Sequence, residues 1–170
     1  MEIKNSQFLL RAWREGDEHA LARHANHPGI ARWMRDIFPH PYTVADGQRW
    51  ISIANAGKNE LNFAIDIDGE TVGGVGLITQ TDIFHRSAEI GYWIGKDFQG
   101  RGIVTAAVRA ITDFAFANLD LCRIWAGVFE NNAASARVLE KAGFAFEARM
   151  RRHVTKNGVT MDLLLYAIVR

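Results

Sequence analysis

Cysteine is almost absent from this sequence, because Cys122 is the only one among 170 residues. A single cysteine excludes an internal disulfide and any zinc site built from several cysteines. The sequence also lacks an apolar run near the roughly 18 residues that a membrane-spanning helix needs. Its first residues lack the long apolar stretch and the small-residue cleavage site of a secretory signal. We therefore expect a protein of the cytoplasm with no membrane partner.

An excess of charge of either sign is also missing. The chain has 20 Lys+Arg against 19 Asp+Glu, a formal net charge of +1. A dedicated nucleic-acid-binding protein usually carries a marked basic excess, so this class is not favoured. Hydrophobic residues make up 48% and charged residues 23%, which is the ordinary composition of a folded globular chain. With no linker or internal repeat, residues 1–170 are expected to form one domain.

Alternating and helical patterns predict a mixed α/β sheet with seven strands and four helices. The expected strands cover residues 8–13, 61–67, 70–79, 87–95, 122–129, 144–154 and 159–169. The expected helices cover residues 18–25, a stretch from 43, a long stretch from the glycine-rich connection to about 118, and 135–142. The dipeptides Asp68-Gly69 and Asn157-Gly158 favour tight hairpin turns between neighbouring strands.

Several residues mark the helix boundaries. Asp17 begins the first helix, and Pro28 is expected to end it. Thr43, with Asp46 three residues later, resembles a capping box. Gly143 suits the left-handed position that follows the last helix.

The most informative stretch runs from residue 91 to 111 as strand, glycine-rich turn and helix. Such a turn leaves the first helical N–H groups without partners, and these groups together with the helix dipole favour an anion. Gly100 and Gly102 would let the backbone approach phosphate oxygens where a Cβ would obstruct them. The P-loop pattern is absent, and Thr105 stands where a dinucleotide fingerprint needs glycine. The pattern indicates a pyrophosphate site of another kind, or a glycine-rich turn without a ligand.

Three segments, AEIGYWI (88–94), QGRGIVTAA (99–107) and NNAASARVLEKAGF (131–144), resemble the GNAT N-acetyltransferase superfamily in the same order. The branch that they resemble is the Rim-type, or ribosomal-protein N-acetyltransferase-like, group. The superfamily's cofactor signature Q/R-x-x-G-x-G/A falls on residues 99–104, with Val104 in place of the usual Gly or Ala. The resemblance covers nearly the whole chain. It implies a single domain with a mostly antiparallel mixed sheet, in which the fourth and fifth strands splay into a V.

The resemblance also implies acetyl-CoA as cosubstrate, held in that splay. Its pantetheine arm would bond the backbone near Trp93 and Ile94. Asn132 and Ser135 match the family's N-x-x-S element, which holds the pantetheine end and faces the thioester. The pyrophosphate would lie on loop amides, so the rest of the expected cofactor-binding set is Gln99, Gly100, Arg101, Gly102, Ile103, Val104 and Thr105.

Glu89 is the expected general base, because an amine with a lysine-like pKa of roughly 10.4 must lose a proton before it can attack a thioester. Strand alternation places Glu89, Gly91 and Trp93 on one face. A carboxylate beside a glycine and a tryptophan suggests a partly apolar cleft, which raises a carboxyl pKa. The alternative is a strand carboxylate paired with a surface arginine or lysine.

A general acid is harder to assign. Many relatives use a tyrosine in the helix after the asparagine element, but Leu139 occupies that position here. Ser135 is the nearest replacement, either as a donor to the sulfur or only as a helix cap. Tyr42 and Tyr92 are weaker candidates.

Two other kinds of chemistry find little support. Cys122 has no histidine near it in sequence, so a covalent thioester route is not favoured. His24 and His27 are followed at once by Pro28 and have no carboxylate pair nearby, so no metal is expected.

The segment RWMRDIFPHPYT (32–43) resembles the Rim-branch loop that walls the acceptor pocket. Phe38, His40 and Tyr42 are therefore candidates, with Glu89, to touch the acceptor; alternatively they pack the turn against the core. A basic cluster near the end could bind an acidic partner or keep an edge strand soluble, and comprises Arg149, Arg151, Arg152, His153 and Lys156.

Taken together, the sequence indicates an acetyl-CoA-dependent N-acetyltransferase that transfers an acetyl group directly to a primary amine in a ternary complex. The acceptor would be a protein N-terminus or a small amine, and nucleic acid is not expected as a partner except through a ribosomal acceptor. A non-catalytic coenzyme A-binding module and a basic-surface RNA-binding protein are the alternatives. Monomer and homodimer both remain open.

Overall fold

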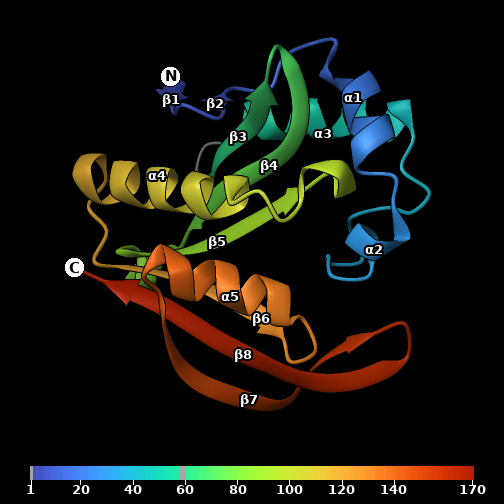
Figure 1. Ribbon diagram of the computed structural model, residues 1–170. Helices are drawn as coiled ribbons and strands as arrows, with labels where there is room; N and C mark the ends of the chain where they lie inside the picture. Colours follow the sequence, from blue (N-terminus) through green and yellow to red (C-terminus); the bar gives the residue numbers. More distant parts are fainter. Residues whose placement is uncertain (1, 58–59) are drawn as a thin grey trace.

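The computed structural model describes residues 2–57 and 60–170 (Figure 1). Within those residues it contains one sheet of eight strands and five α-helices. The strands are β1 (Glu2–Lys4), β2 (Leu9–Arg11), β3 (Glu60–Ile67), β4 (Glu70–Thr79), β5 (Ser87–Ile94), β6 (Arg123–Phe129), β7 (Ala145–Lys156) and β8 (Val159–Val169). The helices are α1 (Asp17–His24), α2 (Pro28–Ala31), α3 (Val44–Ala56), α4 (Ile103–Asn118) and α5 (Ala133–Ala142), with 3-10 turns at Asp82–Phe84 and Lys96–Phe98.

The mixed α/β class is confirmed, but the expected count of seven strands is one too low. The eighth strand is β1, which pairs with β2 so that Ile3 lies opposite Leu10. Its three residues, EIK, are too few to show an alternating pattern, and only the neighbouring strand β2 defines them as a strand. The predicted first strand is also shorter than expected, because β2 ends at Arg11.

The expected count of four helices is likewise one too low, because Pro28 begins a helix instead of ending one. Helix α1 already ends at His24, and Pro28 is the first residue of α2. The side chain of His27 caps α2 by accepting a hydrogen bond from the Gly29 N–H at 2.9 Å. Proline suits the first helical position because its missing N–H would have had no partner there.

The turns and caps read from the sequence are confirmed. Asp68 and Gly69 have φ angles of +54° and +88°, as a type I′ hairpin turn requires. The Asn157-Gly158 turn between β7 and β8 has φ angles of +51° and +78°. Thr43 and Asp46 form the complete capping box at the start of α3.

The sheet opens into a V between β5 and β6, which are the fourth and fifth of the predicted strands. All other neighbouring strands are antiparallel, whereas β5 and β6 run parallel and pair only over Ser87–Glu89 and Arg123–Trp125. Beyond Glu89, β5 continues to pair with β4 as far as Ile94, while β6 continues with β8. The edge of β5 that faces β6 is therefore without a strand partner over residues 90–94.

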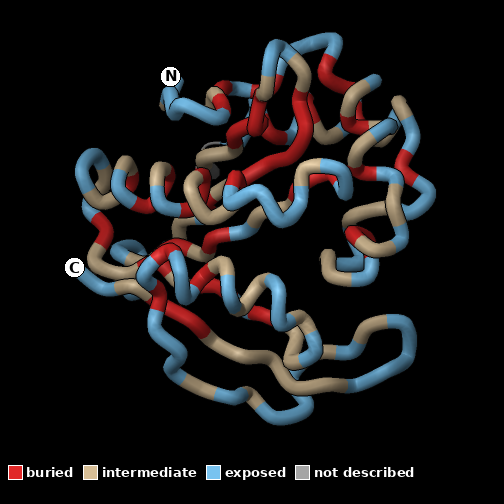
Figure 2. The backbone as a smooth tube through the Cα atoms, viewed as in Figure 1, coloured by how far each residue is buried: buried red, intermediate tan, exposed pale blue. Residues whose placement is uncertain are grey.

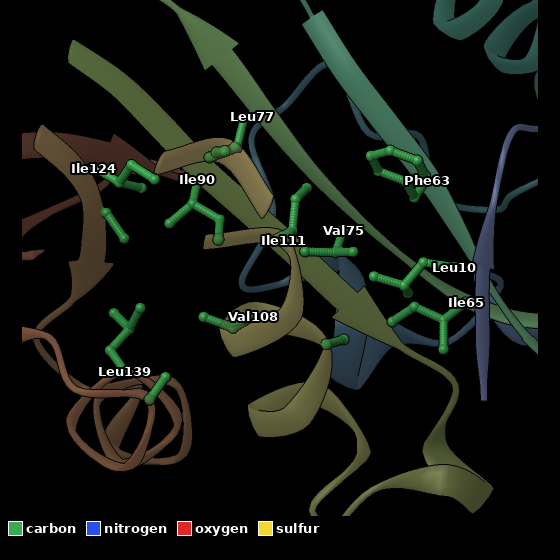
Figure 3. Close-up of a cluster of buried hydrophobic side chains, with 14 of the residues drawn as sticks. Leu10, Phe63, Ile65, Val75, Leu77, Ile90, Val108, Ile111, Ile124 and Leu139 are labelled. Atoms are coloured by element: carbon green, nitrogen blue, oxygen red, sulfur yellow. The ribbon is translucent and has the colours of Figure 1, made fainter. Parts of the chain in front are cut away.

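Two hydrophobic clusters cover the two faces of the sheet. Helices α4 and α5 pack on one face, where Ile90, Val108, Ile111 and Leu139 meet (Figure 3). Helices α1 and α3 pack on the other, around Trp13, Leu21, Ile51 and Ala64. Figure 2 shows the buried backbone concentrated in the central strands, with β7 mainly exposed. No helix in the described part of the chain is long and apolar enough to cross a membrane.

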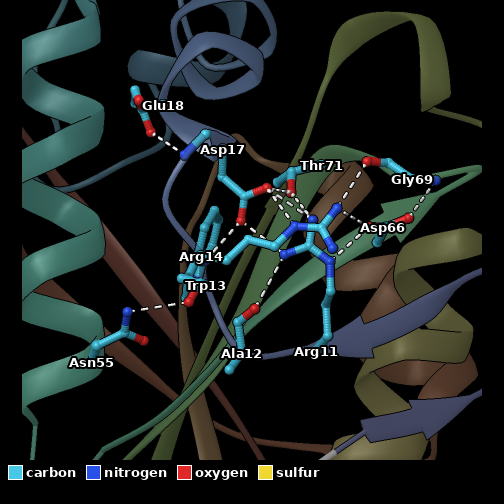
Figure 4. A network of polar contacts seen from close by, with 11 residues as sticks. Arg11, Ala12, Trp13, Arg14, Asp17, Glu18, Asn55, Asp66, Gly69 and Thr71 are labelled. Atoms are coloured by element: carbon cyan, nitrogen blue, oxygen red, sulfur yellow. Dashed lines mark hydrogen bonds and ion pairs between the residues drawn. The ribbon is translucent and has the colours of Figure 1, made fainter.

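A buried ionic network fixes α1 to the sheet (Figure 4). The guanidinium of Arg11 donates to Asp66 Oδ2 at 2.6 Å and to both carboxylate oxygens of Asp17 at 2.8 Å. It also donates to Thr71 Oγ1 at 2.9 Å. Burial alone would raise the pKa of Asp17, but hydrogen bonds from Arg11, the Arg14 N–H and Thr71 lower that pKa below its usual value.

Candidate active site

Two glycines shape the loop between β5 and α4. Gly100 and Gly102 have φ angles of +76° and +78°, the left-handed region that glycine adopts without a steric penalty. A Cβ built on either residue would meet no atom within 4 Å, so the space in front of both is open. The Ala106 N–H donates the first helical hydrogen bond, to the Gly102 carbonyl, so the N–H groups of residues 103–105 precede the helical ladder. This loop fits the phosphates of coenzyme A, because donors and open backbone space coincide.

The other residues of the signature hold the loop in place. The Gln99 side-chain amide donates to the carbonyl of Ile94, the last residue of β5, at 3.4 Å. Ile103 is buried, and Val104 is half-buried within the first turn of α4. Val104 therefore sits in ordinary helical backbone, where a β-branched side chain is accommodated. The Arg101 guanidinium lies 5.3 Å from the centroid of the Phe98 ring.

A histidine on α1, His24, packs against this loop, and the sequence did not predict this contact. The ring of His24 meets the Phe98 ring edge-on, with centroids 5.4 Å apart. Its Nε2 is 2.7 Å from Glu70 Oε1 on β4. A Cβ added to Gly95 would lie 3.1 Å from His24 atoms, so glycine is needed there for the close approach. No sequence motif connects residues 24, 70 and 98.

The unpartnered edge of β5 leads from the sheet to the loop. Ile94 is buried against the cluster beneath α4, and Trp93 packs on the opposite face. This alternation is the one expected from the sequence. The backbone of residues 90–94 lies between the two faces and has no β6 partner, so it is the open edge along which an extended ligand arm could form hydrogen bonds.

Asn132 and Ser135 lie together at the start of α5. Asn132 is the N-cap, and its Oδ1 accepts from the Ser135 N–H at 3.2 Å. The Ser135 hydroxyl is 2.8 Å from the Tyr92 hydroxyl, which also donates to the Ser135 carbonyl at 3.2 Å. Burial raises the pKa of Tyr92 to about 12, although the hydrogen bond from Ser135 opposes the rise. Tyr92 thus stays protonated and connects β5 to α5 across the splay.

Leu139 carries no catalytic group and points into the core. It is fully buried on the inner face of α5, among the aliphatic side chains shown in Figure 3. In place of a tyrosine at this position, the hydroxyl groups of Ser135 and Tyr92 contact each other beside the splay.

Glu89 lies on the face of β5 opposite Tyr92. Its neighbours in the sheet are Ile78 on β4 and Trp125 on β6, and its side chain is 20% exposed. The carboxylate forms an ion pair with the guanidinium of Arg35, from the segment that follows α2. The apolar setting and the arginine partner, which the sequence offered as alternatives, are thus both present.

The segment of residues 32–42 lies over this face of β5. The ring of Phe38 contacts those of Tyr42 and Trp93, at centroid distances of 5.2 and 6.0 Å. Tyr42 is only 5% exposed and belongs to the core beneath α3, so it packs the turn. Phe38 and the exposed His40 line a cavity of about 350 Å³ between this segment and the β7–β8 turn. Phe38 and His40 are therefore the acceptor candidates that the geometry leaves accessible.

Two residues of the basic cluster on β7, Arg149 and Lys156, are paired with carboxylates. Arg149 contacts Asp162 at 2.6 Å and also pairs with Glu130. Lys156 reaches Asp36 at 2.6 Å. Charged side chains protect an exposed edge strand from pairing with other chains, and the pairing of these two cations reduces the charge that they offer to a nucleic acid.

The remaining singled-out residues have structural contacts. The Cys122 thiol donates to the Arg86 carbonyl at 3.5 Å, and the cysteine is half-buried. His24 and His27 are used in the contacts described above. Across residues 2–57 and 60–170, no group of three or more His, Cys, Asp or Glu could hold a metal ion.

Comparison with known proteins agrees with this geometry. The model of the acetyltransferase (GNAT) domain family matches residues 7–145. "Putative ribosomal N-acetyltransferase YdaF" from Bacillus subtilis is 31% identical over 173 residues, which covers 98% of this chain and 93% of that protein. The spermidine N(1)-acetyltransferase of Vibrio cholerae is 26% identical over 160 residues, covering 94% and 91%.

Solved structures show the same fold. Mycobacterium smegmatis RimJ in complex with a CoA disulfide has a TM-score of 0.83 and 32% identity, covering 95% of this chain and 81% of that chain. The Vibrio cholerae spermidine N-acetyltransferase in complex with CoA and spermine has a TM-score of 0.80 and 26% identity, covering 97% and 96%. The chain therefore belongs to the acetyltransferase (GNAT) family, in its Rim-type branch.

Proposed function

We propose that this chain binds acetyl-CoA in the β5–β6 splay and transfers its acetyl group to a primary amine, either a protein N-terminus or a small amine. The observation that carries the proposal is the continuity of the site. An unpartnered strand edge begins just after Glu89, runs over residues 90–94 and leads into a glycine loop at the start of α4. Glu89 and Ser135 approach this edge from opposite faces of the sheet.

The cosubstrate would be held mainly by backbone groups. Amides of residues 99–105 would receive the pyrophosphate, aided by the dipole of α4, which has 16 residues. The open edge at Trp93 and Ile94 would bond the pantetheine arm, and Asn132 would hold the end of that arm. The cosubstrate supplies an acetyl thioester, from which the acetyl group passes to the amine while coenzyme A leaves as a thiol.

Ser135 is the proposed proton donor to the departing sulfur, whose thiol pKa is roughly 8.5. The Asn132 cap fixes the backbone of Ser135, and Tyr92 fixes its hydroxyl. Tyr92 contributes as a positioning residue, because its hydroxyl contacts Ser135 and its raised pKa keeps it protonated. This pair would replace the tyrosine that many relatives carry at the position of Leu139.

Glu89 is the proposed base that accepts a proton from the attacking ammonium group. Its carboxylate is partly buried between apolar neighbours. An ammonium group that reaches it loses hydrogen bonds to water and gains a charge-assisted hydrogen bond to the carboxylate. Arg35 occupies the carboxylate in the structure, so the amine must displace that guanidinium or share the carboxylate with it. Phe38 and His40 would line the approach from the cavity.

The test is an acceptor screen with acetyl-CoA, read out as release of free thiol, alongside calorimetric titration of acetyl-CoA. We expect micromolar to millimolar binding and turnover of at least one amine. Glu89→Gln should lower the rate at neutral pH by about 100-fold or more, the usual contribution of a general base, with the acetyl-CoA affinity nearly unchanged. Equal loss of rate and affinity would make Glu89 structural.

The same screen separates the alternatives. A non-catalytic coenzyme A-binding module would bind the cosubstrate but acetylate no acceptor. An RNA-binding protein would bind RNA with an affinity that falls steeply with salt. The paired state of Arg149 and Lys156 disfavours this last reading.

A further inference from the structure

The ion pair between Arg35 and Glu89 bears on which amines the site accepts, an inference that rests on the proposed function. The Arg35 side chain is 66% exposed, so it reaches the carboxylate from solvent and can leave without opening the core. An exposed guanidinium on a partly buried carboxylate occupies the position where an acceptor ammonium group would bind. Any cationic acceptor therefore competes with Arg35.

Another arginine, Arg32, lies three residues before Arg35 in the same segment. Arg32 lies 4.4 Å from the centroid of the Trp33 ring and has no carboxylate partner within the described residues. Arg32 and the exposed His40 both line the cavity between this segment and the β7–β8 turn, and the lining of that cavity does not include Arg35 or Glu89. The nearby carboxylate of Asp36 is already paired with Lys156, whose side chain is only 12% exposed. Asp36 is the one carboxylate among the residues that line this cavity, so a displaced Arg35 would find no unpaired carboxylate there.

We propose that the acceptor carries an anionic group, a carboxylate or a phosphate, close to its amine. Its ammonium group would replace Arg35 on Glu89, and its anionic group would bind the released Arg35, together with Arg32. This exchange leaves both Glu89 and Arg35 with a partner of opposite charge. A polycation such as spermidine would instead leave Arg35 without an anion and add positive charge near Arg32, and like charges that are brought together cost free energy.

The cavity lined by Arg32, Phe38 and His40 suits an acceptor of modest size. Its volume of about 350 Å³ lies at the lower end of the range for small-ligand pockets, roughly 300–1,000 Å³. Such a volume admits an amino acid or the first residues of a peptide. The anionic group could therefore belong to a free amino acid or to an acidic residue near a protein N-terminus, and both share the same recognition by Arg35.

The experiment compares acceptors that differ only in the anionic group. Tyrosine and tyramine form the small-molecule pair, and peptides beginning Ser-Glu and Ser-Gln form the N-terminal pair, with spermidine as the polycation. In the wild type we expect the anionic member of at least one pair to have a kcat/KM at least ten times higher, because a charge-assisted hydrogen bond contributes roughly 1.5–3 kcal/mol. The pair that responds identifies the source of the anionic group.

Variants at Arg35 separate recognition from a structural role. In Arg35→Gln, kcat/KM should fall for the acceptor that carries the anionic group and rise for the acceptor that lacks it, because the competitor for Glu89 is gone. In Arg35→Glu the preference should reverse toward spermidine. Arg170→Gln, which removes an exposed arginine paired with Asp113 at the C-terminus, is the matched control and should change neither value.

The outcomes are distinct. A wild-type preference for tyramine, Ser-Gln and spermidine, or a parallel fall of all acceptors in Arg35→Gln, overturns the inference while leaving the proposed function intact. If no acceptor releases thiol, the proposed function fails, and calorimetric binding of tyrosine and tyramine to wild type and Arg35→Glu then decides the inference by itself. Tighter binding of tyrosine only when Arg35 is present supports it; equal binding in both proteins overturns it.

Discussion

Replacing Gly102 by alanine tests the phosphate loop most directly, because the added methyl group enters the space where the anion is proposed to bind. Gly102 has a φ angle of +78°, and its added Cβ would meet no atom of the protein within 4 Å. The substitution therefore introduces backbone strain without a steric clash in the folded protein. Gly69 offers a matched control, since its φ is +88° and its added Cβ also meets nothing within 4 Å.

The stability loss should be small and similar in the two variants. Left-handed backbone costs an alanine roughly 1–2 kcal/mol, and the reduced entropy of the unfolded chain offsets about 0.4–1 kcal/mol of this. The net loss is about 1 kcal/mol. For a domain of this size that corresponds to a fall in Tm of about 2–4 °C.

The affinity for acetyl-CoA should separate the two variants. At Gly102 the new methyl group would hold a phosphate away from at least one backbone N–H, and a hydrogen bond to a charged group contributes roughly 1.5–3 kcal/mol. This predicts about a 10- to 100-fold rise in Kd for Gly102→Ala. Gly69 lies in the β3–β4 turn, outside the proposed site, so Gly69→Ala should bind as the wild type does.

Calorimetric titration gives Kd and thermal unfolding gives Tm for the three proteins. Wild-type affinity in Gly102→Ala, with the expected fall in Tm, would refute the placement of the phosphates at this loop. An equal loss of affinity in Gly69→Ala would show that strain, rather than obstruction, weakens binding.

Three further predictions concern the buried network and the hydroxyl pair. Arg11→Leu leaves Asp17 and Asp66 without their cation and should lower the free energy of unfolding in urea by about 3–5 kcal/mol; a loss under about 1 kcal/mol would contradict the network's role. Because the folded-state pKa of Asp17 is lowered, its contribution to stability is present above its unfolded pKa near 3.9 and is lost as the pH falls through the lower folded value. Asp17→Asn should therefore flatten the acid decline of Tm below about pH 4, and an unchanged slope would argue against it. Tyr92→Phe removes the partner of the Ser135 hydroxyl and should slow thiol release by up to about tenfold at unchanged KM for acetyl-CoA; a changed KM alone would assign Tyr92 to binding.

Much of the site could be predicted because its residues are neighbours in sequence. The glycine loop, the Asn132 cap and the alternation along β5 depend on local backbone conformation, which nearby residues determine. The Asn157-Gly158 turn was predictable for the same reason. Local rules failed at Pro28, because the same residue can end one helix or begin the next, and the His27 cap decides between them.

Contacts between distant segments were not predictable. Arg35 reaches Glu89 across 54 residues of sequence, and Tyr92 reaches Ser135 across 43. The support of Phe98 by His24 likewise depends on how α1 packs on the sheet. Each of these side chains has many possible partners in the unfolded chain, and only the packed sheet selects one.

The sequence by itself indicated the family, through the resemblance of three segments. It also determined the order of the strands and helices other than β1 and α2 and the positions of the glycine loop and its neighbouring cap, since these follow from short-range backbone preferences. The tertiary structure decided which charges and hydroxyls face one another across the splay. It placed an arginine on the proposed base and a tyrosine on the proposed acid, because those pairings depend on the packing of separate elements rather than on any local pattern.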